Sequence, residues 1–217
     1  QPVLHGTLMI QFNDKTIYVD PYGGKQAFDG LDKPDLILIT DIHGDHLNED
    51  TLDGINAEGT PIIAPQAVKD SMSEKYQNNT SVVNNGEKHG DLGILIEAIP
   101  MYNLPEAPDA KHVKGRGNGY ILTLGDKRVY ISGDTEDIPE MRGLQEIDIA
   151  FVCMNLPYTM DINQAASAVL EFEPAIVYPY HYRGRPDMSD TTAFKTLVDN
   201  GSKEIEVRLR NWYPEYE

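Results

Sequence analysis

The chain has 217 residues, enough for a domain with a sizeable buried core, and its 40% hydrophobic and 24% charged residues are typical of a soluble globular protein. Its net charge is −17, from 18 basic and 35 acidic residues. An acidic surface repels phosphate backbones, so we expect no nucleic-acid partner. No apolar run approaches the roughly 18 residues that cross a bilayer, so no membrane partner is expected either.

A lone cysteine, Cys153, lies in an apolar run and is expected in the core, and it excludes an internal disulfide framework. The chain begins at Gln1 rather than Met, which leaves a cytoplasmic protein and an exported one with a cleaved signal both open. The oligomeric state is open as well.

Apolar patterns and turn residues predict the elements of the first half. The turn dipeptide Asn13-Asp14 between two apolar runs indicates a hairpin. Asn48 is a good N-cap, and acidic residues directly after it favour a helix start. The predicted order is strands Leu4–Ile10, Thr16–Asp20 and Leu36–Thr40, a helix from Asn48, strand Pro61–Ala64, a helix near Gln66–Lys75, and strand Ser81–Val83.

The second half continues the alternation of strands and helices, without a repeat or a linker. The predicted order is strand Gly93–Ile99, a long loop over Met101–Gly119, a hairpin of Tyr120–Leu124 and Arg128–Ser132, strand Ile147–Met154, helix Asn163–Glu171, strand Ala175–Tyr178, helix Thr191–Val198 and strand Ile205–Leu209. Mixed strands and helices in this order indicate a layered α/β protein. We therefore expect one domain over residues 1–217.

Three apolar runs end in His or Asp. The run ending at Thr40 leads into Asp41–His46, the run ending at Ser132 into Asp134, and the run ending at Pro179 into His181. Sites in α/β sheets lie outside the carboxyl ends of strands, so these side chains are expected to converge. Imidazole and carboxylate together are ligands for zinc, iron or manganese.

The segment Asp41–His46 is the densest of these clusters, with four potential ligands in six residues. One alternative is a solvated loop before a helix N-terminus, where Asp is ordinary. Two histidines three residues apart, in a segment that also holds two aspartates, favour a metal site instead.

These residues resemble the motif of the metallo-β-lactamase-fold hydrolases, which is His-x-His-x-Asp-His followed by a distant His, an Asp and a final His. Here the chain reads Asp41-x-His43-x-Asp45-His46, then Gly-Asp134-Thr and Tyr-His181. An early strand-end Asp-Pro, at Asp20, also resembles the family, in particular its branch of ascorbate-phosphate lactonase-like proteins. The resemblance implies a four-layer αββα sandwich, with two mixed sheets inside and helices outside.

The chain departs from the family pattern at two positions. Asp41 replaces the first histidine, which favours manganese or iron over zinc. Where the family has its next histidine the chain has Asn103, and His112 in the long loop is the expected substitute, with Asn103 as the alternative. The run that begins at His112 also resembles the lactonase-like branch.

The resemblance implies two divalent metal ions, zinc, manganese or iron. The expected ligands are Asp41, His43 and His112 for one ion, Asp45, His46 and His181 for the other, with Asp134 between them. Two such ions lie roughly 4 Å apart and lower the pKa of a shared water to about 7. Asp45 is also the expected catalytic residue, which orients that water and passes its proton to the leaving group. Asp20 and Thr135 are expected to hold the ligands in place.

Basic residues near these ligands are candidates for substrate binding. Lys114 and Arg116 are either plain loop charges or binders of a phosphate or carboxylate group, and Asn103 is a further candidate. Arg183 and Arg185 invite the same interpretation. The remaining histidines lack motif neighbours. His5 is expected as a structural residue, although the implied fold would also let it line the pocket, and His89 is expected as a solvated residue in a polar turn.

The sequence therefore predicts a metal-dependent hydrolase that uses metal-activated water to cleave an ester, lactone, amide or phosphodiester bond of a small molecule. The alternative is a degenerate protein of the same fold, with one metal ion or without catalysis.

Overall fold

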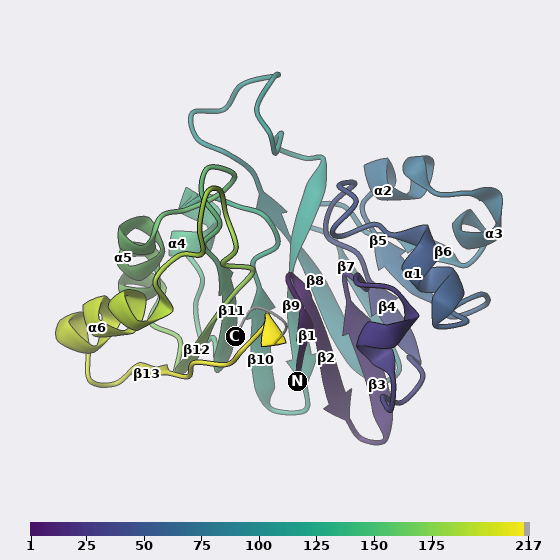
Figure 1. Cartoon of the computed structure of the whole chain (residues 1–217), viewed down its shortest axis with the longest axis horizontal. Coiled ribbons are helices and arrows are strands. Elements are labelled where there is room, and N and C mark those ends of the chain that lie inside the picture. The colour runs from purple at the N-terminus through teal and green to yellow at the C-terminus, as the bar shows by residue number, and fades with distance from the viewer. Residues whose placement is uncertain (215–217) are drawn as a thin grey trace.

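The computed structural model describes residues 1–214, which form two β-sheets packed between helices (Figure 1). The first sheet has six strands that lie side by side in chain order. Neighbours from β1 to β3 are antiparallel, whereas neighbours from β3 to β6 are parallel. The strands are β1 (Pro2–Leu4), β2 (Thr7–Phe12), β3 (Lys15–Val19), β4 (Leu36–Leu38), β5 (Ile62–Ala64) and β6 (Thr80–Val82).

The second sheet has seven strands in the spatial order β13-β12-β11-β10-β9-β8-β7. Neighbours from β7 to β10 are antiparallel, and neighbours from β10 to β13 are parallel. The strands are β7 (Lys88–Asp91), β8 (Ile94–Met101), β9 (Gly117–Leu124), β10 (Lys127–Ile131), β11 (Ile149–Cys153), β12 (Ile176–Tyr180) and β13 (Glu206–Val207).

Helices cover the outer side of each sheet. In Figure 1, α1–α3 lie beside the first sheet on the right and α4–α6 beside the second on the left. They are α1 (Glu49–Gly54), α2 (Gln66–Ser71), α3 (Glu74–Gln77), α4 (Pro139–Arg142), α5 (Ile162–Phe172) and α6 (Thr191–Gly201), with a 3₁₀ helix, η1 (Lys25–Phe28). Within residues 1–214, no helix has the length and apolar character that a bilayer span requires.

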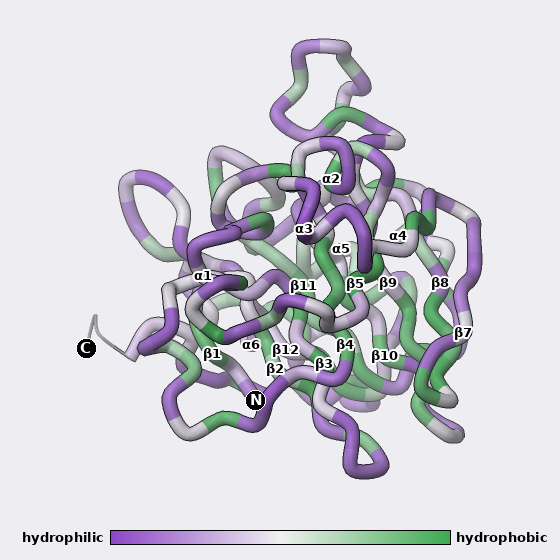
Figure 2. The backbone as a smooth tube through the Cα atoms, turned by 90° about the vertical axis from the view of Figure 1, so that its right-hand side faces the viewer, coloured by the Kyte–Doolittle hydropathy of each residue, from purple (hydrophilic) through white to green (hydrophobic). Residues whose placement is uncertain are grey.

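Strand β4 shows how the layers are held together. Leu36 and Leu38 pack into the core between the sheets, whereas Ile37 and Ile39 pack against the helices of the first sheet. Successive side chains of a strand point to opposite faces, so a wholly apolar run suits a strand covered on both sides. Hydrophobic segments accordingly lie in the strands, and the outer loops are mainly hydrophilic (Figure 2). The αββα sandwich implied by the sequence is confirmed.

Local structure departs from the sequence expectation in three places. The run Leu4–Ile10, predicted as one strand, is interrupted by a turn at His5, which has a φ of 58°, so that β1 pairs with β2. The helix predicted near Gln66–Lys75 is divided into α2 and α3, because Met72 is extended and its side chain is buried. His89 lies in the edge strand β7 rather than in a polar turn, and this strand is polar because it is largely exposed.

Candidate metal centre

The segment Asp41–His46 follows β4 and folds into a turn. The N–H of His46 donates to the carbonyl of His43 at 2.9 Å, and α1 begins shortly afterwards at its N-cap, Asn48. Asp41 and His46 are buried, whereas His43 and Asp45 are half-buried. The turn therefore concentrates four ligand-type side chains between a buried strand and a capped helix.

Unusual backbone conformations lead into the other two motif positions. Gly133, which precedes Asp134, has a φ of 61°, and a Cβ there would lie 2.7 Å from Sδ of Met101 and 3.0 Å from the carbonyl of Asn118. Only glycine fits without displacing these neighbours. His181, directly after β12, has a φ of 47°. Non-glycine residues with such φ values are strained by roughly 1–3 kcal/mol and cluster at functional sites.

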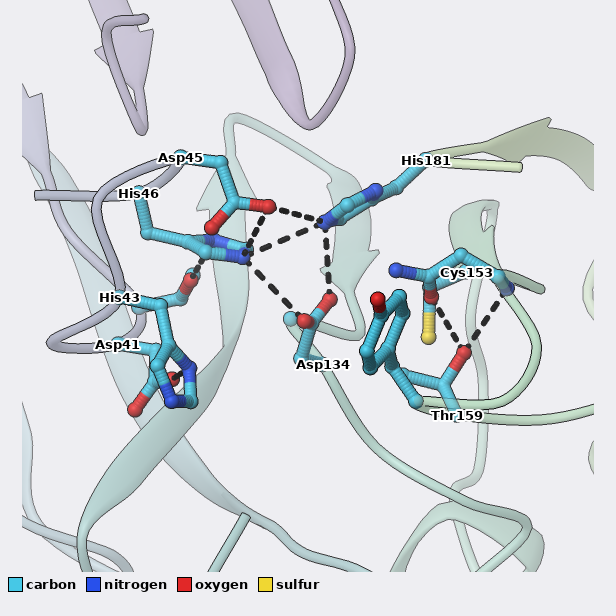
Figure 3. A network of polar contacts seen from close by, with 12 residues as sticks. Asp41, His43, Asp45, His46, Asp134, Cys153, Thr159 and His181 are labelled. Atoms are coloured by element: carbon cyan, nitrogen blue, oxygen red, sulfur yellow. Dashed lines mark hydrogen bonds and ion pairs between the residues drawn. The ribbon is translucent and has the colours of Figure 1, made fainter. Parts of the chain in front are cut away.

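Asp134 lies at the middle of the cluster (Figure 3). Its Oδ2 is 3.2 Å from Nε2 of His112 and 3.3 Å from Nε2 of His46, and its Oδ1 is 3.1 Å from Nε2 of His181. The Nε2 atoms of His46 and His181 are 3.3 Å apart. The two oxygens of one carboxylate thus face imidazoles from three separate stretches of the chain.

The first motif residues join His112 in a neighbouring group. Nε2 of His112 is 3.9 Å from Oδ2 of Asp41, and Nδ1 of His43 contacts the same oxygen. His43 and His112 stand edge to face, with ring centroids 5.1 Å apart. The structure therefore places His112, not Asn103, beside Asp41 and His43.

Asp45 lies on the other side of the cluster. Its Oδ2 is 3.6 Å from Nε2 of His181 and 3.9 Å from Nε2 of His46. His5 also reaches this carboxylate, with its Nε2 at 3.1 Å from Oδ2. For His5 a structural role was expected first and a place in the pocket second, and the structure brings it to the edge of the cluster. Gly6, inside an apolar run, is the sequence signal for the tight turn that puts it there.

The protonation of the cluster reflects its burial and its charges. Burial lowers the pKa of His181 to about 3, despite the attraction of Asp134, so its imidazole is neutral and able to donate a lone pair at neutral pH. Burial works against the charged form of Asp134, but the three surrounding imidazoles outweigh it and hold the pKa of this carboxyl well below its usual range. The pKa of His46 is raised, because Asp134 and Asp20 outweigh its burial. A cation that binds here would replace that proton.

The donor set fits divalent metal ions. Three groups of side chains bring one ligand atom each within 4.8 Å of one another: Asp41, His43 and His112; His46, Asp134 and His181; and His5, Asp45 and His181. Ligands about 2.1 Å from a tetrahedral ion lie about 3.4 Å apart, close to the spacing around Asp134. Among residues 1–214, Nε2 of His112 and Oδ1 of Asp134 are buried without a hydrogen bond. Burying such atoms is costly unless another partner, such as a cation, binds them.

Asp20 holds His46 from behind. Its Oδ2 accepts a hydrogen bond from Nδ1 of His46 at 2.7 Å, and both oxygens also accept from Thr40, from the amide at 2.7 Å and from the hydroxyl at 2.6 Å. This contact fixes the tautomer that directs Nε2 toward Asp134. The hydroxyl of Thr135, expected in the same role, hydrogen-bonds instead to the backbone of Tyr102 and Glu136.

Asn103 acts on the backbone of the long loop. Its Oδ1 accepts the N–H of His112 at 2.7 Å, and its own N–H donates to the carbonyl of His112 at 2.9 Å. Its Nδ2 donates to Glu136 and to the carbonyl of Tyr158. These contacts occupy the amide of Asn103 and give it the positioning of His112, a role different from the two considered for it, metal ligand and substrate binder.

The two basic residues of the loop differ in their surroundings. Lys114 is paired with Glu106 and Glu140, and its ammonium lies 4.4 Å from the centre of the Tyr102 ring. It therefore fastens the loop, which corresponds to a loop charge and not to the substrate binder considered as the alternative. The guanidinium of Arg116 lies 3.4 Å from Oδ1 of Asp41. The guanidinium of Arg116 therefore pairs with the carboxylate of a candidate metal ligand.

A cleft of about 460 Å³ opens over the cluster. His5, His43, Asp45 and Asp134 line it from the side of the candidate ligands. The other lining residues are Lys111, Asn155, Tyr158, Arg183, Gly184 and Arg185. Of these, only Arg183 and Arg185 are candidates from the sequence. Lys111 is a single lysine in a polar loop, and no sequence signal marks it as a site residue.

Comparisons with known proteins agree with this architecture. The family model of the beta-lactamase superfamily domain matches residues 3–181. A UPF0173 metal-dependent hydrolase of Pyrococcus abyssi is 31% identical over 215 residues, which is 94% of this chain and 93% of the relative. A crystal structure from Parabacteroides distasonis, provisionally described as a metal-dependent hydrolase, has a TM-score of 0.82 at 40% identity, over 96% of this chain and 90% of that one. Igni18, a metallo hydrolase of Ignicoccus hospitalis, has a TM-score of 0.80 at 25% identity, over 97% and 94% of the chains.

Two sheets between helix layers, with His and Asp side chains gathered where strands end, define a metallo-β-lactamase-fold protein. The chain belongs to the beta-lactamase superfamily. Within it, the chain is one of the UPF0173 metal-dependent hydrolases, an enzyme group whose members match it over nearly their whole length.

Proposed function

We propose that the chain is a binuclear hydrolase that cleaves an ester, lactone, amide or phosphodiester bond in a small molecule. The observation that carries the proposal is the position of Asp134, whose Oδ2 lies 3.2 Å from His112 and whose Oδ1 lies 3.1 Å from His181. A carboxylate that lies between the two groups of candidate ligands, with His112 on one side and His181 on the other, is suited to bridge two metal ions. A cleft of about 460 Å³ suits a small molecule as substrate.

Two ligand sets follow from these contacts. When bound, two divalent cations supply Lewis acidity and lower the pKa of a shared water to about 7. The residues that would hold them are Asp41, His43 and His112 on one side and His46, His181 and Asp45 on the other, with Asp134 between. Arg116 offsets part of the negative charge of Asp41 and restrains its carboxylate.

Asp45 is proposed as the residue that handles the proton. It is half-buried, lines the cleft, and reaches His181 and His5 with the same oxygen. Burial disfavours its charged form, but the hydrogen bond from His5 and the nearby imidazoles hold the pKa of Asp45 well below its ordinary value. It is therefore a carboxylate at neutral pH, able to accept a hydrogen bond from the attacking water and to orient it. The proton passes through this oxygen to the leaving group.

The test combines metal content with turnover. Elemental analysis of protein supplied with manganese, iron or zinc is expected to find two ions per chain, and Asp134→Ala is expected to lose at least one of them. A screen of lactones, phosphodiesters and amides should then find a reaction that falls at least 100-fold in this variant. Asp126→Ala is the control, because Asp126 is exposed in a turn. One ion or none, together with no turnover, would favour the single-metal or non-catalytic alternative.

A further inference from the structure

The cleft over the candidate ligands has a basic lining, although the chain as a whole is acidic. The chain has a net charge of −17, yet three cationic side chains, Lys111, Arg183 and Arg185, line the cleft. The carboxylates that line it, Asp45 and Asp134, both belong to the ligand cluster. The part of the cleft beyond the ligands is thus basic.

Lys111 and Arg185 differ from the other cations around the site. Lys114 pairs with Glu106 and Glu140. Within residues 1–214, by contrast, no carboxylate lies in ion-pair distance of Lys111 or Arg185, and both residues are exposed. The ammonium of Lys111 lies 5.9 Å from the ring centre of Tyr158, another lining residue. Both cations line the cleft over the candidate ligands, so a bound molecule could supply the negative charge that they lack.

The backbone that carries Lys111 is held in place. Its carbonyl accepts a hydrogen bond from the guanidinium of Arg116 at 2.6 Å. The next residue, His112, is bound through both its N–H and its carbonyl to Asn103. The base of the lysine is thereby fixed relative to the candidate ligands, and only its side chain is free to reach a bound molecule.

The backbone that carries Arg185 is equally fixed. Its N–H donates to the carbonyl of Leu156 at 2.8 Å. Gly184 lies so close to Leu156 that a Cβ would stand 1.9 Å from that carbonyl, so no larger residue fits. Arg183 and Met188 form an isolated β-bridge that closes this loop. Preorganised supports of this kind reduce the entropy lost when a ligand binds.

We propose that Lys111 and Arg185 form a subsite for an anionic group of the substrate, a carboxylate or a phosphate, next to the metal centre. The inference rests on the proposed function and deepens it, since it names the chemical class of the substrate. A guanidinium offers two parallel N–H donors that match the oxygens of either group, and the ammonium adds a second charge. An anion held there places the neighbouring bond of the same molecule over the candidate ligands.

Binding of simple anions tests the subsite directly. Inorganic phosphate and acetate are titrated calorimetrically into the metal-loaded protein and into Lys111→Met and Arg185→Met variants, in which a neutral side chain of similar length replaces the cation. The affinity for the preferred anion is expected to fall about tenfold in each variant, as for one charge-assisted hydrogen bond partly open to solvent. Lys33→Met is the matched control, because Lys33 is exposed and lies outside the cleft.

The two anions separate the two sources of charge: tighter binding of phosphate indicates a phosphorylated substrate, and tighter binding of acetate a carboxylated one. Equal affinities in the wild type and both variants, or no measurable binding, would overturn the subsite.

Hydrolysis provides a second readout. Two p-nitrophenyl esters, the acetate and the hemisuccinate, differ by a remote carboxylate. The wild type is expected to prefer the hemisuccinate in kcat/KM, and the ratio of the two values should fall about tenfold in the Lys111→Met and Arg185→Met variants. Equal use of both esters counts against the subsite alone. Failure to cleave any ester, amide or phosphodiester counts against the proposed function, and the anion titration still decides the subsite.

Discussion

His5, near the start of the chain, contacts both Tyr213, near the end of the described residues, and Asp45 in the cleft. Its Nε2 lies 3.1 Å from Asp45, and its Nδ1 lies 2.6 Å from the hydroxyl of Tyr213. The rings of His5 and His181 are in contact, with centroids 4.0 Å apart. When the Tyr213 hydroxyl donates a hydrogen bond to Nδ1 of His5, the ring proton sits on Nε2, and this N–H donates a hydrogen bond to Asp45. The tyrosine thereby fixes the direction in which the proposed proton carrier points.

Replacing His5 separates this positioning role from packing. His5→Phe removes the donor to Asp45, and kcat is expected to fall about tenfold with little change in KM, because the interaction matters most when the water is activated. His5→Gln keeps an N–H donor at the end of the side chain and should recover part of the loss. The measurement is steady-state kinetics on the substrate that the screen identifies. Equal losses in both variants would point to packing, and no loss in either would remove His5 from the reaction.

The residue scale also shows why the sequence revealed some site residues and not others. Asp41–His46 is recognisable because its ligands are dense, and Asp134 and His181 because each follows an apolar run. The sequence does not show which groups His5 contacts, because its partner Tyr213 is 208 residues away in the chain and only the fold brings the two together. The sequence leaves Lys114 open between a loop charge and a substrate binder, because its partners Glu106 and Glu140 cannot be recognised from sequence spacing.

At the scale of elements, the loop between β8 and β9 carries the one candidate ligand outside the family spacing. This loop rises above the sheets at the top of Figure 1. Asn103, at the start of this loop, makes two hydrogen bonds to the backbone of His112. Two further hydrogen bonds join its side chain to Glu136 and to the backbone of Tyr158. The position of His112 therefore depends on an amide near the base of the loop.

Asn103→Ala is expected to loosen this loop while the sheets remain folded. It removes three side-chain hydrogen bonds, each worth about 0.5–1.5 kcal/mol. Hydrogen exchange over residues 104–116 should become at least tenfold faster, and the metal content should fall as His112 loses its position. Asn200→Ala, in the exposed part of α6, is the control. Unchanged exchange in the loop would contradict the positioning role.

Elements with a strong periodic signal were predictable, and those decided by packing were not. The apolar run that became β4 and the N-cap Asn48 of α1 appear where expected. The break at Met72 was missed because a buried methionine, not Gly or Pro, ends the helix. The short helix α4, which has four residues, carries too little periodicity to be recognised.

For the whole molecule, the site depends on how the two sheets are joined. The segment Asp41–His46 follows β4 of the first sheet, whereas Asp134 and His181 follow β10 and β12 of the second. One core, which includes Leu38 of β4 and Ile131 of β10, packs these sheets against each other. An apolar pattern shows that a face is buried but not which face covers it. The sandwich therefore came from the family resemblance rather than from periodicity.

Because ligands from both sheets converge, a bound metal should stabilise the whole fold. A single bound ion, present at 1,000 times its dissociation constant, adds about 4 kcal/mol to the free energy of unfolding. For a chain of this size, that raises the Tm by roughly 8–16 °C. Calorimetric scans with a chelator and with increasing metal should show the shift, and Asp134→Ala should lose most of it. The same Tm under all these conditions would mean that no cation binds the folded chain more tightly than the unfolded chain, which would remove the metal centre itself.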